Sequence, residues 1–171
     1  MNFKSYIVLI LILFLSRDII AQKKTTTIHI LNADKADYDE RLGKDIQRLI
    51  GNVVMRQDST YFYSDSAYYN EKTKFFDGFG NVHIEVNDST DIYSDLLKYN
   101  GNTKFAELFH NVVLKDDSTT LRTEYMTYDR VGHLATYPNK GTITRNDKKL
   151  VSKQGYYRDD IKVVYFRKDV V

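Results

Sequence analysis

Acidic residues recur at one position of a repeated sequence pattern, and carboxylates at such a spacing could bind metal. The pattern is a large apolar residue, a spacer, a small residue and an acid, and the acids are Asp34, Asp65, Asp95 and Glu124. Hard cations such as Ca²⁺ take several carboxylate oxygens, so a metal ladder is one interpretation. The fifth copy has Lys153 at this position. Because the acid recurs once per repeat, we favour a structural role in a bend of the strand, with backbone amides as partners, and expect no metal.

Tyrosines form a second column, four residues after each acid-type position: Tyr38, Tyr69, Tyr99, Tyr128 and Tyr157. Aromatic rings with a polar end can stack on sugars, which would make the column a carbohydrate-binding surface. The alternative is that the rings pack between strands while their hydroxyls reach solvent. We favour this second interpretation.

The remaining candidates for catalysis do not form a constellation. The histidines are scattered over different repeats, at His29, His83, His110 and His133. His110 takes the place that Gly51 and Gly80 have in other copies, so we interpret it as a rim or core residue. The chain has no zinc-ligand spacing, phosphate-binding glycine loop or nucleophile elbow. We therefore expect no catalytic residue and no cofactor, and an enzyme is the least favoured hypothesis.

These columns belong to a repeat of about 30 residues, which is the mark of a repeat architecture. Its second half carries a Gly-Asn-Val element at 50–55 and 79–84, with variants at 109–114 and 139–144. Clusters of Asn, Asp, Ser, Thr and Gly separate the halves, as expected for tight turns. Each period therefore predicts two short antiparallel strands, and the whole chain predicts an all-β fold.

Alternation within these strands predicts one apolar sheet face. Phe76, Val82 and Ile84 share one face of the second strand of a repeat. In the first strand, Phe62 and Tyr69 are seven residues apart, which strict alternation places on opposite faces. Either both faces of this strand are covered or a β-bulge at the small-acid pair shifts the parity. We favour the bulge, because it also turns the aspartate outward.

The first residues predict export. Lys4, an apolar run at 6–15 and Ala21 resemble a Sec signal peptide at 1–21 with cleavage after Ala21, leaving one domain at 22–171. The alternative, a membrane anchor, is disfavoured because a spanning helix needs about 20 apolar residues. The chain has no Cys, which excludes a disulfide scaffold. Its formal net charge of +2 gives no basis for binding nucleic acid.

The joint recurrence of apolar-x-small-Asp, the downstream tyrosine and Gly-Asn-Val behind a signal peptide resembles the OstA-like family, from residue 28 to about residue 166. The resemblance implies a periplasmic antiparallel β-jellyroll, or β-taco, with an apolar groove between two sheets. It implies that the groove receives the acyl chains of lipopolysaccharide. It also implies head-to-tail homo-oligomers and contacts with other bridge components of lipopolysaccharide transport through strand edges. The copies depart from the pattern at His110, at 139–144 and at Lys153.

From the apolar columns we predict the residues that line this groove and bind lipid: Ile28, Ile30, Phe62, Val82, Ile84, Ile92, Val112, Leu114, Leu121, Ile143 and Leu150. The competing hypothesis is a structural or adhesive β-repeat protein that binds a glycan or protein partner and has a filled interior. The state of the interior discriminates between the two.

Overall fold

The computed structural model describes residues 27–38, 41–167 and 169–170, and the predicted signal peptide lies outside this part of the chain. The described residues form a single 13-stranded sheet. Its strands are β1 His29–Asn32, β2 Lys35–Tyr38, β3 Ile46–Gln57, β4 Thr60–Asn70, β5 Phe75–Asn87, β6 Thr90–Asn100, β7 Phe105–Asp116, β8 Thr119–Asp129, β9 Leu134–Tyr137, β10 Gly141–Arg145, β11 Lys148–Ser152, β12 Gln154–Arg158 and β13 Val163–Arg167.

Neighbouring strands are antiparallel throughout, and β3 to β8 pair in chain order. The predicted all-β antiparallel jellyroll is therefore confirmed. The long strands have 11 to 13 residues, more than the 8 to 10 that the turn spacing suggested, because each continues through a bend. The two facing layers consequently belong to one continuous sheet that is folded over.

A line of register shifts marks where the sheet folds. Pairing between β4 and β5 shifts between Tyr63 and Ser66, and pairing between β5 and β6 shifts between Phe79 and Val82. The predicted bulge is thus confirmed, and it places Phe62 and Tyr69 on the same, buried side. We call this line the crease. It divides the sheet into a first wall (β1, 53–64, 82–94, 112–123, β10 and β11) and a second wall (β2, 46–50, 66–79, 96–109, 125–129, β9, β12 and β13).

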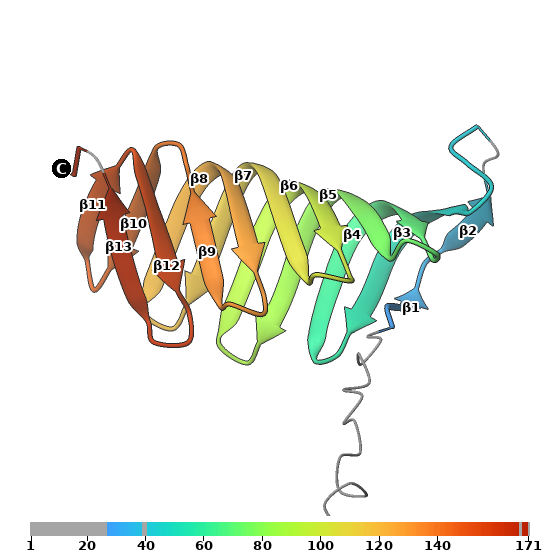
Figure 1. The fold of residues 1–171 in the computed structure, drawn as a ribbon, viewed down its shortest axis with the longest axis horizontal. Helices are drawn as coiled ribbons and strands as arrows, with labels where there is room; N and C mark the ends of the chain where they lie inside the picture. Colours follow the sequence, from blue (N-terminus) through green and yellow to red (C-terminus); the bar gives the residue numbers. More distant parts are fainter. Residues whose placement is uncertain (1–26, 39–40, 168, 171) are drawn as a thin grey trace, which may run out of the picture.

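The two walls separate at both ends of the sheet. At the N-terminal end β1 pairs with the part of β3 at 54–56, while β2 pairs with the part at 47–50. At the C-terminal end β8 pairs with β10 through 119–123 and with β9 through 127–129. Figure 1 shows β1 and β2 apart at one end and the β10–β11 and β12–β13 pairs at the other. The sheet therefore never closes, and it ends in four strand edges.

Repeated side-chain contacts hold the crease. The amide Nδ2 of Asn81 donates to Oδ2 of Asp65 at 2.9 Å, and the pairs Asn52–Asp34 and Asn111–Asp95 repeat this bond at 2.9 and 2.7 Å. Gly80 has φ +70°, and a Cβ there would lie 2.4 Å from Oδ2 of Asp65. The recurring Gly-Asn and the recurring acid are thus one device, in which asparagine is the partner that the sequence alone did not suggest.

The small residue before each acid also has a fixed role. Ser64 donates its hydroxyl to the carbonyl of Ser66 at 3.0 Å, two residues on. Ser94, Thr123 and Ser152 make the same bond at 3.1 to 3.3 Å. The bulge interrupts hydrogen bonding between the strands, and the short hydroxyl side chain donates a hydrogen bond to a backbone carbonyl there. This explains why a Ser or Thr recurs at this position of the repeat.

The fourth copy of the Gly-Asn-Val element, at 139–144, is where the sheet splits. Pro138 follows β9, and Gly141 begins β10, so the strand that would continue across the crease is interrupted. Proline has no N–H to donate to a ladder, which favours a strand end here. The decayed repeat thus corresponds to the C-terminal fork.

Candidate functional site

One apolar row runs through the first wall from end to end. Registered pairs connect Ile30, Met55, Phe62, Ile84, Ile92, Leu114, Leu121, Ile143 and Leu150. At the usual strand separation of roughly 4.8 Å this row is about 38 Å long. It faces the interior between the walls, where Phe62 lies 4.7 Å from Tyr99 and 5.2 Å from Phe76 between ring centroids.

Ten of the eleven residues predicted to bind lipid lie on this wall, and Ile28 directly precedes its first strand, β1. Nine are buried, with exposed fractions of 4% or less: Ile28, Phe62, Val82, Ile84, Ile92, Val112, Leu114, Leu121 and Ile143. Ile30 is 36% exposed and Leu150 is 39% exposed, because they lie on β1 and β11 at the ends of the sheet. The structure thus brings the predicted residues together in one interior surface, which is exposed at its two ends. Between the ends the side chains of the two walls pack against each other, so the expected open groove is corrected to a filled interior.

The second wall supplies the other half of the interior, and the prediction missed it. Its row alternates tyrosines with small or apolar residues in register: Tyr69, Phe76, Tyr99, Ala106, Tyr128, Ala135, Tyr157 and Val164. Leu97, Leu108 and Met126 are buried beside it. The signal was present, since Phe76 shares a strand face with Val82 and Ile84. It was overlooked because the bulge moves the tyrosine column to the interior.

Polar side chains close the edge opposite the crease, where turns of the two walls meet. Arg130 of the second wall donates from Nη1 to Oε1 of Gln57 at 3.0 Å and from Nη2 to Oγ1 of Thr60 at 2.7 Å. Tyr99 also donates to Oε1 of Gln57. Nε2 of Gln57 donates to the carbonyl of Gly101 at 2.9 Å. The Arg130 side chain is only 8% exposed, so this cluster is a buried polar contact between the walls.

A second cluster closes the same edge further along. The Tyr157 hydroxyl donates to Oδ2 of Asp116 at 2.7 Å, and Nζ of Lys162 contacts the same oxygen. Asp116 belongs to the first wall, while Tyr157 and Lys162 belong to the second. The Asp116 side chain is 1% exposed, and its Oδ1 is buried without a partner. We call the Gln57–Tyr99–Arg130 and Asp116–Tyr157–Lys162 clusters together the rim clasp.

From Tyr69 to Tyr157 the tyrosine column therefore ends inside the protein, which corrects the expectation that these hydroxyls reach solvent, whereas Tyr38 is 66% exposed. Burial is the main reason that the pKa of Tyr99 rises to about 12, and the Arg130 guanidinium opposes this rise. Burial, together with hydrogen bonds to carboxylates, also raises the pKa values of Tyr128, bonded to Asp159, and Tyr157. These phenols stay protonated donors. Tyr99 and Tyr157 therefore bridge the edge without adding charge, while Tyr128 bonds within the second wall.

Aromatic rings on the outer surface are stacked on one another. The rings of Tyr63 and His83 are 5.2 Å apart, those of His83 and Tyr93 are 4.5 Å apart, and Lys115 covers the far side of Tyr93 at 5.1 Å. Sugar stacking needs a free ring face. The faces within this stack are already occupied.

The acids and His110 have structural positions. Asp34, Asp65 and Asp95 hold crease asparagines, which confirms the structural role expected of them. His110 is exposed at the crease with φ 63°, so the core alternative of its interpretation as a rim or core residue was wrong. Within the described part of the chain, no three His, Cys, Asp or Glu side chains are grouped as a metal site requires. The same residues contain no helix long and apolar enough to cross a membrane.

Comparisons with known proteins bear on this fold. The family described as OstA-like protein matches residues 25–171. No curated protein gives a match. Among solved structures, the chain is similar to LptH, the LptA homologous periplasmic component of the conserved lipopolysaccharide transport device from Pseudomonas aeruginosa. That similarity has 14% sequence identity and a TM-score of 0.34, and it covers 83% of this chain and 82% of LptH.

Proposed function

Because the chain belongs to the family of OstA-like proteins, we propose that it is a bridge module that carries lipopolysaccharide through the periplasm. The acyl chains occupy the space between the walls, against the apolar row of the first wall and the tyrosine row of the second. No step of this function is catalytic, and partners at the two membranes supply the driving force.

The observation that carries the proposal is the continuity of the apolar row. Its side chains are buried along the middle of the sheet and become exposed at Ile30 and Leu150, the two ends. An ordinary β-sandwich core has no need of such ends, whereas a passage for apolar chains requires them. Each CH₂ group that leaves water gains ~0.8 kcal/mol.

Loading requires the walls to move apart. The interior side chains already pack against the opposite wall, as the Phe62–Tyr99 contact shows. A lipid therefore replaces contacts between the walls, and the net gain is the burial of the lipid itself. The rim clasp is the only part of the edge opposite the crease that we identify as joining the walls through buried polar contacts. We propose that it yields when lipid enters.

End-to-end assembly follows from the four unpaired strand edges. Added strands satisfy such edges, which otherwise promote uncontrolled association. The N-terminal end exposes Leu31 at 48%, and the C-terminal end exposes Leu150 and Tyr165 at 39% and 42%. Because the two ends differ, contact between copies is heterologous and can continue into a row of subunits or onto related bridge components. Export through the predicted signal peptide at 1–21 brings the chain to the periplasm.

Photo-crosslinking tests this function. A small diazirine amino acid is placed at Ile84 or Leu114, which face the interior, and at their neighbours Glu85 or Lys115, which face outward. Each pair consists of two neighbouring residues on one strand, whose side chains face opposite sides of the wall. We expect lipopolysaccharide adducts in cells at Ile84 and Leu114 only. Equal labelling of all four positions, or labelling of none, would refute the carrier.

The competing function expects a filled interior, and the packing of the two walls agrees with that expectation. Its binding platform has less support. The tyrosine column that could form a binding platform is buried from Tyr69 to Tyr157. On the outer surface, the Tyr63–His83–Tyr93 stack uses its own ring faces. If a glycan were bound on the outer surface, adducts at Glu85 and Lys115 would exceed those inside.

A further inference from the structure

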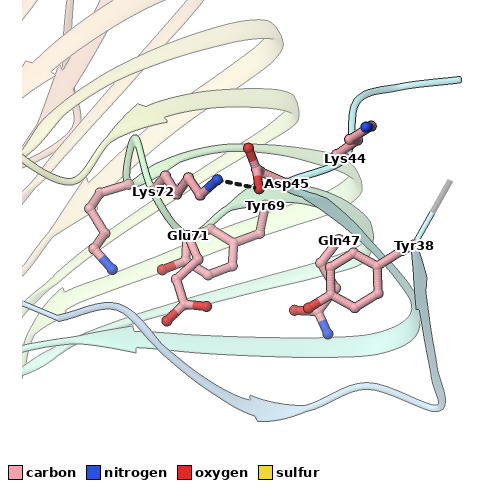
Figure 2. Close-up of a pocket in the computed structure, with 8 residues that line it drawn as sticks. Tyr38, Lys44, Asp45, Gln47, Tyr69, Glu71 and Lys72 are labelled. Atoms are coloured by element: carbon pink, nitrogen blue, oxygen red, sulfur yellow. Dashed lines mark ion pairs between the residues drawn. The ribbon is translucent and has the colours of Figure 1, made fainter. Parts of the chain in front are cut away.

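A pocket of about 620 Å³ lies at the N-terminal end of the interior. Tyr38, Gln47 and Tyr69 line it and are register partners on β2, β3 and β4, in line with the tyrosine row of the second wall. The pocket therefore continues the interior at the point where the walls separate. Figure 2 shows Tyr38 and Gln47 on one side of it and Tyr69 beside Glu71 on the other. Its volume is in the range of small-ligand sites.

One buried donor in this pocket has no partner. Tyr69 is 4% exposed, and its hydroxyl, which is buried below the pocket surface, makes no hydrogen bond with any residue that the structure describes. By contrast, Tyr99 and Tyr157 donate across the edge to Gln57 and Asp116. His29 on β1 pairs with Arg56 on β3, so Ile28 is the β1-side neighbour of Gln57. Ile28 therefore takes the place opposite Tyr69 that Gln57 takes opposite Tyr99. An apolar side chain cannot accept a hydrogen bond, so the hydroxyl keeps an unmet demand for an acceptor.

Three lysines border the same pocket. Lys72 pairs with Asp45 at 2.7 Å, as the dashed line in Figure 2 marks. Lys44 and Lys74 make no ion pair with any other residue that the structure describes. Glu71 lies beside Tyr69, and its carboxylate makes no ion pair with any other residue that the structure describes. The pocket thus presents ammonium and hydroxyl donors together with the carboxylates of Glu71 and Asp45 and the side-chain amide of Gln47.

We propose that this pocket binds the phosphorylated sugar headgroup of a lipid whose acyl chains enter the interior. Lys44 and Lys74 contact the phosphate, the Tyr69 hydroxyl donates to it or to the adjoining sugar oxygen, and Glu71 accepts from a sugar hydroxyl. Ammonium groups and a neutral phenol are suitable phosphate donors. The assignment deepens the proposed function and relies on it for the position of the acyl chains.

Titration of the purified chain with soluble headgroup mimics tests the site. Glucosamine 1-phosphate, inorganic phosphate and glucosamine are added separately, and amide NMR shifts around the pocket report binding. We expect the sugar phosphate to bind more tightly than either part alone. Tyr69→Phe and Lys44→Gln should each weaken it about fivefold, since each removes one hydrogen bond to the anion. Lys148→Gln, on exposed β11 at the far end, should leave binding unchanged.

Tyr69→Phe retains the ring and removes only the unpartnered hydroxyl, so its thermal stability should equal or exceed that of the parent chain. Equal effects of Lys148→Gln and Lys44→Gln would overturn the site, as would equal affinity for phosphate and sugar phosphate. Pocket shifts that depend on protein concentration without ligand would assign the pocket to a second copy and also overturn it. If lipopolysaccharide crosslinks to Ile84 and Leu114 but the sugar phosphate causes no NMR shifts, this site alone is rejected. If the sugar phosphate binds but no crosslinks form at Ile84 and Leu114, the carrier function is rejected.

Discussion

Replacing Arg130 by methionine should loosen the contact between the walls. The guanidinium makes hydrogen bonds to Oε1 and the carbonyl of Gln57, to the Tyr99 hydroxyl and to Thr60, while it is 8% exposed. Methionine keeps much of the packing over the Phe62 ring, which lies 5.8 Å from the guanidinium carbon. The substitution therefore tests the polar contacts more than the volume.

The loss of stability depends on which hydrogen bonds remain in the Arg130→Met variant. Hydrogen bonds to charged groups contribute about 1.5–3 kcal/mol each, but removing a buried cation also recovers its desolvation cost. Thr60 still donates to the carbonyl of Val86, and Tyr99 still donates to Gln57. The Gln57 carbonyl loses its Arg130 donor. We therefore expect Arg130→Met to lower the free energy of unfolding by roughly 2–4 kcal/mol.

Urea unfolding measures this loss, which corresponds to a midpoint shift of about 1–2 M for an m-value near 2 kcal/mol/M. Hydrogen exchange should quicken at the turns around 57–60 and 101–104, and lipid adducts at Ile84 should increase because the walls part more easily. The matched control is Arg158→Met, whose side chain donates to Asp160, two residues away in the same wall. Equal losses for both variants would refute the clasp as a specific link between the walls.

Three further predictions concern the tyrosines, the crease and the ends. The unfolded chain releases the Tyr99 proton near pH 10 while the folded chain holds it to about pH 12, so the folded form binds more protons between these values. This contribution is present below pH 10, and roughly 2–3 kcal/mol of it is lost as the pH rises to 12, a loss that unfolding of Tyr99→Phe should lack. Gly80→Ala should cost about 1–3 kcal/mol in thermal unfolding, because φ is +70° and the added Cβ meets Asp65. Gly78→Ala, in ordinary backbone, should cost less. Because the chain contains no other Cys, Leu31→Cys with Leu150→Cys should form a ladder of disulfide-linked copies on oxidation, whereas either change alone should give dimers at most.

Local rules were enough to predict the repeat, the strands and the bulge. The small-acid pair and Gly-Asn each act within a few residues of the crease, so their spacing indicates where the backbone bends. The tyrosine parity at Phe62 and Tyr69 then requires a bulge if both are to be buried. The interior residues of the first wall follow from the same alternation, and nine of the eleven predicted residues are buried.

The rim clasp could not be predicted in this way. Gln57 reaches Tyr99 and Arg130, which are 42 and 73 residues away along the chain. Asp116 meets Tyr157, 41 residues away. Such pairings depend on how far the twist of the sheet displaces one wall along the other, a cumulative property of all the strands. The sequence showed a decayed Gly-Asn-Val motif near Pro138 and Gly141, but it did not predict that the sheet splits there.

The crease has a consequence for how such a protein could change in size. Six long strands, β3 to β8, each belong to both walls, so the separation of the walls is set by the bend within a strand and by the clasp across its edge. Insertion of one more repeat would add two strands and lengthen the interior by about 10 Å while its cross-section stays the same. The length and the cross-section of the space between the walls are therefore independent in this architecture, and evolution can change the length by duplication of a repeat alone.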